Sequence, residues 1–261
     1  MTTPFNHSTQ FHCCFMNWVL QQYQDMDQLA NALSTITDPD SDELKRLRDK
    51  GIKHFEEYYT ENRAQTMRPH GGMSYIHPPW CSTLEKAFMW LGGSRATLPI
   101  RLLYAVCGSE LNAQMEEYLR GDWERKGNVL AEISNQQLDK INDLQCKTIT
   151  KEVKLSTKMA LLQEEIADIP FAIIATKAGQ VREWSQEIDS ALAAHTLSIS
   201  QIMKKADELR VTTMKELIAI LTPLQAVDFL IVTKKLHLSI HEWGKTMDRQ
   251  PADQNGAVNN I

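Results

Sequence analysis

Apolar residues in the last strongly patterned stretch of the chain, residues 221–244, recur at the spacing of an α-helix. At about 100° per residue they form two apolar sectors rather than one. The first sector holds Leu224, Val227, Leu230, Ile231 and Leu238, and the second holds Phe229, Val232, Leu236, Ile240 and Trp243. A helix that is apolar on two sides is typical of the centre of a bundle, or of a helix that packs on both its own domain and a partner.

Local signals set the limits of this helix. Thr222 and Gln225 have the spacing of a capping box, and Pro223 falls at the first helical position, where a missing N–H costs nothing. Gly244 follows Trp243 at the position where a left-handed residue would end the helix. The sequence therefore predicts a central C-terminal helix over residues 223–243.

The same periodicity predicts helices through the rest of the chain. Two long ones cover about residues 135–168 and 183–220, and the first would span about 45–50 Å. Shorter helices are predicted at about 11–33, 42–59, 83–91 and 98–107. Alternating strand patterns and hairpin signals are nearly absent, so we expect an all-α helical bundle over residues 11–248. Residues 1–10 and 249–261 are expected to be disordered.

Charge and composition narrow the class of protein. The net charge of −5, the pI near 5.9 and the absence of Lys or Arg before Lys45 argue against autonomous nucleic-acid binding. There is no run of about 18 apolar residues, which argues against a membrane span. The five cysteines form no C-x-x-C pair, so we expect a reducing compartment, the nucleus or the cytoplasm.

His237 and His241 are the sharpest candidates for a functional site. They stand four residues apart, which puts both imidazoles on one face of the helix with Cβ atoms about 6 Å apart. That geometry suits two ligands on one metal ion, but it cannot place both histidines on opposite sides of one haem. A second interpretation stays open, in which both are polar residues near a helix C-terminus that the helix dipole stabilises.

Other candidate sites are weaker. His12, Cys13 and Cys14 are metal-ligand types, but adjacent residues on a helix point apart. Arg95 follows a glycine pair and could bind an anion, although a structural ion pair with Glu85 is the preferred interpretation.

Neither the tryptophans nor the acidic residues indicate catalysis. The tryptophans expected in the core are Trp18, Trp80 and Trp90. The acidic residues without a paired-carboxylate spacing are Asp168, Asp207 and Asp228. The sequence also has no Gly-rich phosphate loop, G-x-S-x-G or H-E-x-x-H motif, so it favours a non-enzymatic protein.

An ordered set of short motifs over about residues 11–248 resembles the Delay of Germination domain of plant seed-dormancy regulators. The same domain forms the C-terminal part of the TGA-type bZIP transcription factors. The motifs include Phe15 with Trp18, Pro79-Trp80, Leu84-Glu85, Trp90 to Gly93, Leu162 to Glu164, Ala167 to Pro170, Leu221 to Phe229 and Lys234 to Gly244.

The resemblance implies a helical, non-enzymatic regulatory domain of the seed dormancy and abscisic-acid signalling type. It implies protein partners, either a type 2C protein phosphatase or a TGA-type bZIP factor, and self-association as a homodimer. DNA would be reached only through such partners, because no basic region precedes the domain in this sequence. It also implies haem binding by the final histidine pair, which matches here as His237 and His241.

Overall fold

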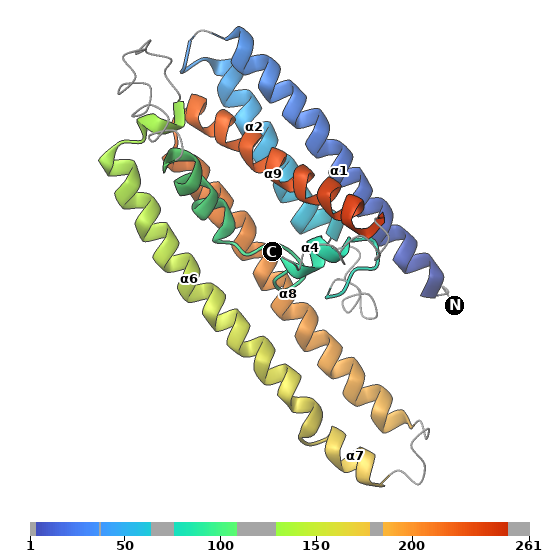
Figure 1. The fold of residues 1–261 in the computed structure, drawn as a ribbon. Coiled ribbons are helices and arrows are strands. Elements are labelled where there is room, and N and C mark those ends of the chain that lie inside the picture. Colours follow the sequence, from blue (N-terminus) through green and yellow to red (C-terminus); the bar gives the residue numbers. More distant parts are fainter. Residues whose placement is uncertain (1–3, 37, 64–75, 109–128, 178–184, 250–261) are drawn as a thin grey trace, which may run out of the picture.

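The computed structural model describes residues 4–36, 38–63, 76–108, 129–177 and 185–249. Within these ranges the chain is built from helices and turns, with no β-strand, which confirms the all-α prediction (Figure 1). The α-helices are α1 Pro4–Thr35, α2 Asp42–Glu57, α4 Thr83–Ala87, α6 Asn135–Glu164, α7 Phe171–Lys177, α8 Gln186–Ile220 and α9 Pro223–Arg249. Residues 98–108 are also helical, and a single π-helical turn, η1 Tyr58–Asn62, extends α2. Short 3₁₀ turns lie at η3 Val129–Glu132 and η4 Glu165–Ala167.

The helices form a bundle with a long two-helix projection. α9 packs against α1, α2 and α4, while α6 and α8 run antiparallel along one another (Figure 1). The lower ends of α6 and α8, together with α7, extend past the other helices. We call residues 149–177 and 185–199 of this hairpin the arm. None of the described helices is long and apolar enough to cross a membrane.

The main hydrophobic core lies where α9 meets the rest of the bundle. Phe229 and Val227 of α9 are completely buried, with Leu44 from α2, Ile141 from α6 and Leu217 from α8. Residues from both predicted apolar sectors of α9 reach this core, which confirms α9 as a central packing helix. Trp243, which belongs to the predicted second sector, is 58% exposed instead, because that side of α9 faces solvent while His241 and Gly244 on the opposite side are buried.

The predicted helix starts are confirmed by their capping bonds. The Ser82 hydroxyl accepts from the backbone N–H of Glu85, whose carboxylate accepts from the backbone N–H of Ser82. Thr222 and Gln225 form the same reciprocal pair at the start of α9. These bonds satisfy backbone donors that the first helical turn leaves without partners.

The predicted end of α9 at Gly244 was wrong. The helix continues through Gly244 to Arg249, and Gly244 is buried against the N-cap of α4. A Cβ at position 244 would stand 2.0 Å from Ser82 Oγ, so glycine is required by the close approach of two helices rather than by a left-handed backbone. The predicted C-terminal tail lies outside the described residues from position 250 onward.

Two other predicted boundaries also differ. α1 begins at Pro4, so the backbone of residues 4–10 is helical where disorder was expected, and proline is favoured at a first helical position. α4 ends at Ala87 instead of Leu91, because residues 90–93 form a tight turn. Leu91 and Gly92 both have positive φ, at 47° and 73°, which is the requirement of a type I′ turn.

The long helices are close to their predicted ranges. α6 ends at Glu164, and η4 and α7 follow as separate short pieces rather than as one continuous helix to residue 168. α8 starts at Gln186, where the Ser185 hydroxyl accepts from the backbone N–H of Ile188.

Candidate functional site

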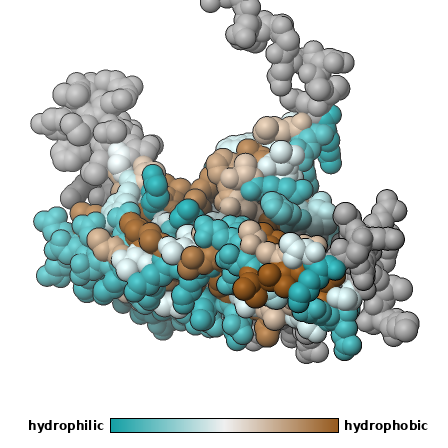
Figure 2. Space-filling model, turned by 90° about the horizontal axis from the view of Figure 1, so that it is seen from below, coloured by the Kyte–Doolittle hydropathy of each residue, from teal (hydrophilic) through white to brown (hydrophobic). Residues whose placement is uncertain are grey.

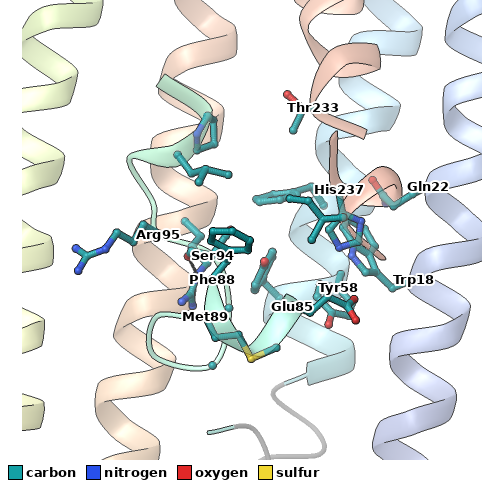
Figure 3. Close-up of a pocket in the computed structure, with 18 of the residues that line it drawn as sticks. Trp18, Gln22, Tyr58, Glu85, Phe88, Met89, Ser94, Arg95, Thr233 and His237 are labelled. Atoms are coloured by element: carbon teal, nitrogen blue, oxygen red, sulfur yellow. Dashed lines mark hydrogen bonds between the residues drawn. The ribbon is translucent and has the colours of Figure 1, made fainter. Parts of the chain in front are cut away.

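A cavity of about 320 Å³ lies between α1, α2 with η1, α9 and the segment 78–102 (Figure 3). Its walls come from these four stretches and from Arg210 and Met214 of α8, which are far apart in the sequence, so the cavity exists only once the bundle has assembled. The volume falls at the small end of the ~300–1,000 Å³ range of small-molecule sites. The cavity is therefore large enough for a small organic ligand.

Aromatic side chains form much of the cavity wall. The rings of Trp18 and Tyr58 stack with centroids 4.4 Å apart, and Phe55 tilts against Trp18 at 6.1 Å. Phe88 and Leu98 also line the cavity and are 62% and 41% exposed, so its mouth opens to solvent between apolar side chains. An apolar lining with an apolar rim suits a lipophilic guest.

His237 lines this cavity beside Trp18 (Figure 3). Its ring centroid is 6.3 Å from that of Trp18, and its Nδ1 is buried with no hydrogen-bond partner among the described residues. Burial lowers the pKa of His237 from 6.5 to about 4, and the opposing influence of Glu85 is smaller. The imidazole is therefore neutral at physiological pH and can act as a ligand or as a hydrogen-bonding group.

His241 has a different environment, although it lies one helical turn further on. Its Nδ1 donates to Glu85 Oε1 at 2.8 Å, and its ring packs edge-on against Phe15 at 5.6 Å. The other oxygen of Glu85 accepts from Ser82, so the Glu85 carboxylate joins α9 to the start of α4. His241 does not line the cavity, and its side chain is only 3% exposed.

The structure therefore separates the two predicted site residues. If a haem bound in the cavity, His237 would hold it, because this imidazole is neutral, lines the cavity and has a buried nitrogen without a hydrogen-bond partner among the described residues. His241 is not among the residues that line the cavity, so it would not reach a group bound there, although its Nε2 is also buried without a hydrogen-bond partner among the described residues. The described cavity is small for a haem, so the residues present fit the group only through His237 and only with the mouth widened at Phe88 and Leu98.

Charged groups around the cavity are paired with one another. Arg210 donates to Asp207 and to the backbone carbonyls of Trp90, Leu91 and Ser94, which fixes the tight turn. Arg95 pairs with Glu152 at 3.2 Å, so the predicted pairing of Arg95 with Glu85 was wrong. Glu85 instead belongs to His241, because α4 faces α9 while Arg95 faces α6.

The other candidate residues from the sequence are placed as structural ones. Trp18 and Trp90 are buried, as predicted, whereas Trp80 is only partly buried and lines the cavity. Cys13 is exposed while Cys14 turns inward toward the cluster around Trp18, so the pair does not converge. Among the described residues, no group of three His, Cys, Asp or Glu is arranged to hold a metal ion.

A buried polar network next to the cavity was not predicted. Lys234 Nζ donates to Asp25 Oδ2 and Gln22 Oε1, both at 3.0 Å, and His54 Nδ1 lies 2.9 Å from the other oxygen of Asp25. The network ties α9 to α1 and α2. A signal was available, because Leu230, Lys234 and Leu238 follow one another at spacing four, which places the lysine on a buried face.

Comparison with known proteins identifies the family. A family profile described as seed dormancy control, DOG1, matches residues 25–105. Protein DOG1-like 3 of Arabidopsis thaliana is 35% identical over 241 residues, which cover 91% of this chain and 84% of that protein. The chain belongs to the Delay of Germination (DOG1) family. The resemblance seen in the sequence is thus confirmed.

More distant relatives extend the comparison beyond the DOG1-like proteins. Protein RESPONSE TO ABA AND SALT 1 of Arabidopsis thaliana is 24% identical over 246 residues, covering 92% of this chain and 97% of that protein. Transcription factor TGA2 of Arabidopsis thaliana is 25% identical over 246 residues, covering 93% of this chain but 63% of TGA2. The DOG1-family domain is therefore shared with a bZIP-related group of transcription factors, as the motifs indicated.

Proposed function

We propose that this DOG1-family protein is a non-enzymatic regulator of seed dormancy and germination in the abscisic-acid signalling class, acting by contact with other proteins. The observation that carries the proposal is the match over 91% of this chain to a DOG1-like protein, supported by a relative named for its response to abscisic acid and salt. The proposed partner is a type 2C protein phosphatase, and the proposed location is the nucleus, the cytoplasm or both.

Affinity capture from maturing seed extract tests this role. The tagged chain is expected to retain a type 2C phosphatase or a TGA-type factor, identified by mass spectrometry. The double variant His237→Ala plus His241→Ala, checked for folding by circular dichroism, shows whether the histidines contribute to capture. Recovery of neither protein class by the folded wild type would count against the proposal.

The second candidate function is that of a transcription co-regulator that joins DNA-bound TGA-type dimers. The similarity to TGA2 over 93% of this chain favours it. In this role the protein reaches DNA only through its partner, in keeping with its net charge of −5. Adding the chain to a TGA-type dimer on its DNA site should produce a supershift, and an unchanged band would exclude this role.

Self-association through the arm is part of the proposed contact function. Apolar side chains on the arm reach solvent, with Ile149 45%, Val153 58% and Leu161 56% exposed. Figure 2 shows that the face of the molecule seen from below carries apolar patches among hydrophilic surface. A pair of helices buries one side of each, and a second copy of the hairpin would complete a four-helix arrangement.

Sedimentation tests the homodimer. Ile149→Glu plus Val153→Glu, on one face of α6, should shift the protein toward monomer. Leu20→Glu is the matched control, since Leu20 is an exposed leucine on α1 at 56%. A monomeric wild type, or equal dimerisation of both variants, would exclude the arm as the contact surface.

Haem binding is proposed at His237 rather than at both histidines. Bound haem would supply a redox- or gas-responsive iron, and His237 would hold it while Glu85 keeps His241 outside the cavity. A Soret titration should therefore lose its response in His237→Ala and keep it in His241→Ala. Equal loss in the two variants would contradict this assignment.

A further inference from the structure

Two neutral polar side chains on the cavity wall each have a buried atom without a hydrogen-bond partner among the described residues. Gln22 is 4% exposed, lines the cavity and has a buried Nε2 with no hydrogen-bond partner among the described residues. His237 Nδ1 is in the same condition, and both side chains lie on the wall formed by α1 and α9 (Figure 3). A buried polar atom left without a partner costs about 1–3 kcal/mol, so this pair of atoms points to a polar group of a ligand.

The neighbouring charges do not call for a charged ligand. Arg210 and Arg63 both pair with Asp207, Arg95 pairs with Glu152, and Lys234 pairs with Asp25. The Glu85 carboxylate accepts hydrogen bonds from Ser82 and His241. Counted together, the guanidinium groups of Arg63, Arg95 and Arg210 balance the carboxylates of Glu85, Glu152 and Asp207. An ionised group placed inside the apolar cavity would bring an uncompensated charge there, which is costly.

We infer that the cavity binds a small, neutral, mainly apolar molecule whose carbonyl or hydroxyl oxygen hydrogen-bonds to Gln22 Nε2 and His237. The amide N–H of Gln22 donates to that oxygen. The neutral imidazole donates or accepts according to its tautomer. The flat body of the ligand packs on the stacked pair of Trp18 and Tyr58. This inference goes beyond the proposed regulatory role and does not depend on it.

The side chains at the mouth of the cavity also favour an apolar ligand. Phe88 and Leu98 keep large exposed surfaces at the rim, although the exposure of apolar side chains to water is unfavourable. Phe88 directly follows the short helix α4, which Glu85 joins to α9 through His241. A ligand that reaches the rim would cover these side chains, and it would therefore sit next to the contact between α4 and α9.

The probe for this inference is Prodan, a neutral naphthalene ketone whose emission shifts to the blue in apolar sites. We expect saturable binding to the full-length chain with a blue shift. His237→Phe and Gln22→Met should each raise the Kd about three- to tenfold, the effect of one lost hydrogen bond. Leu236→Trp and Leu98→Trp, which fill the cavity from the wall and from the mouth, should abolish binding.

Matched controls keep the outcome decisive. His195→Phe removes another imidazole on α8, outside the cavity, whose buried Nδ1 makes no hydrogen bond and lies 3.6 Å from Glu165 Oε2, and this change should leave the Kd unchanged. The naphthoic acid analogue of Prodan carries a carboxylate in place of the ketone and should bind at least tenfold more weakly. Thermal unfolding measurements check that every variant is folded. If one of the two filling variants does not fold, the other still tests whether the probe occupies the cavity.

The inference is overturned if Prodan keeps its affinity in the folded filling variant, if His237→Phe and Gln22→Met bind like wild type, or if the acid binds as tightly as the ketone. Because the readout is ligand fluorescence, failure to capture a protein partner leaves this result unaffected. Haem competes with Prodan if both use the cavity, and its Soret band distinguishes the two ligands.

Discussion

His237 and His241 lie one helical turn apart on α9, yet only His237 lines the cavity, while His241 is bound to Glu85 of α4. The difference arises from what α9 meets along its length. At His237 the facing side chain is Trp18, which leaves a space, whereas at His241 the helix α4 approaches closely. A histidine pair that appears equivalent in sequence therefore divides into a cavity residue and a packing residue.

The first prediction concerns pH. The folded chain keeps His237 neutral down to a pKa of about 4, while in the unfolded chain it takes up a proton near pH 6.5. Stability from the neutral imidazole is thus complete above about pH 6.5 and falls as the pH drops toward 4, by as much as about 1.4 kcal/mol per pH unit. Urea unfolding at pH 7.5 and 5.0 should show a loss about 2 kcal/mol greater for wild type than for His237→Phe. An identical pH dependence in both proteins would show that His237 is not buried as a neutral group.

The second prediction concerns the close approach of α9 and α4. Gly244→Ala places a methyl group 2.0 Å from Ser82 Oγ, so one helix must shift. We expect a loss of about 1–3 kcal/mol of unfolding free energy. Gly108→Ala is the control, since a Cβ at that glycine meets nothing within 4 Å, and its effect should stay within about 1 kcal/mol. Equal effects of the two substitutions in denaturant titrations would contradict the tight packing at Gly244.

The cap at Thr222 and the glycine at position 244 show what local sequence signals can and cannot predict. Helix caps such as Thr222 with Gln225 were predicted because each cap depends only on residues within four positions of one another. Gly244 was misassigned because its role depends on Ser82, more than 150 positions away. The pairing of Arg95 with Glu152 was also missed, because it joins residues 57 positions apart. A glycine at a plausible helix end cannot be distinguished, from sequence alone, from a glycine that lets another helix approach.

The candidate site was predictable only in part for the same reason. His237 was identified because the i, i+4 histidine pair is visible in the sequence. Gln22 and Trp18 were not connected to it, because α1 meets α9 only in the folded bundle. The cavity is formed by five assembled segments, and no single segment carries a signal for it.

The third prediction concerns the buried lysine of the polar network. Burial opposes the charges of Lys234 and Asp25, and the pKa of Asp25 is nevertheless held below its ordinary value by Lys234 and His54. Lys234→Met should therefore destabilise the protein by about 3 kcal/mol, because it leaves a buried carboxylate without its main partner.

The controls for Lys234→Met are a surface lysine and a double variant. Lys45→Met breaks an exposed pair with Asp40 and should cost less than about 1 kcal/mol. Asp25→Asn plus Lys234→Met removes both charges and should be more stable than Lys234→Met alone. If Lys234→Met unfolds at the same denaturant concentration as Lys45→Met, the buried pair has no structural role.

The most direct test of the regulatory role is a binding measurement with purified components. The full chain is titrated by calorimetry against a purified type 2C protein phosphatase and, separately, against a purified TGA-type bZIP dimer. We predict saturable binding to the phosphatase, with micromolar or tighter affinity, and binding to the TGA-type dimer instead would favour the co-regulator role. If the folded chain gives no binding heat with either protein at tens of micromolar, the claim that it acts through these partners is contradicted.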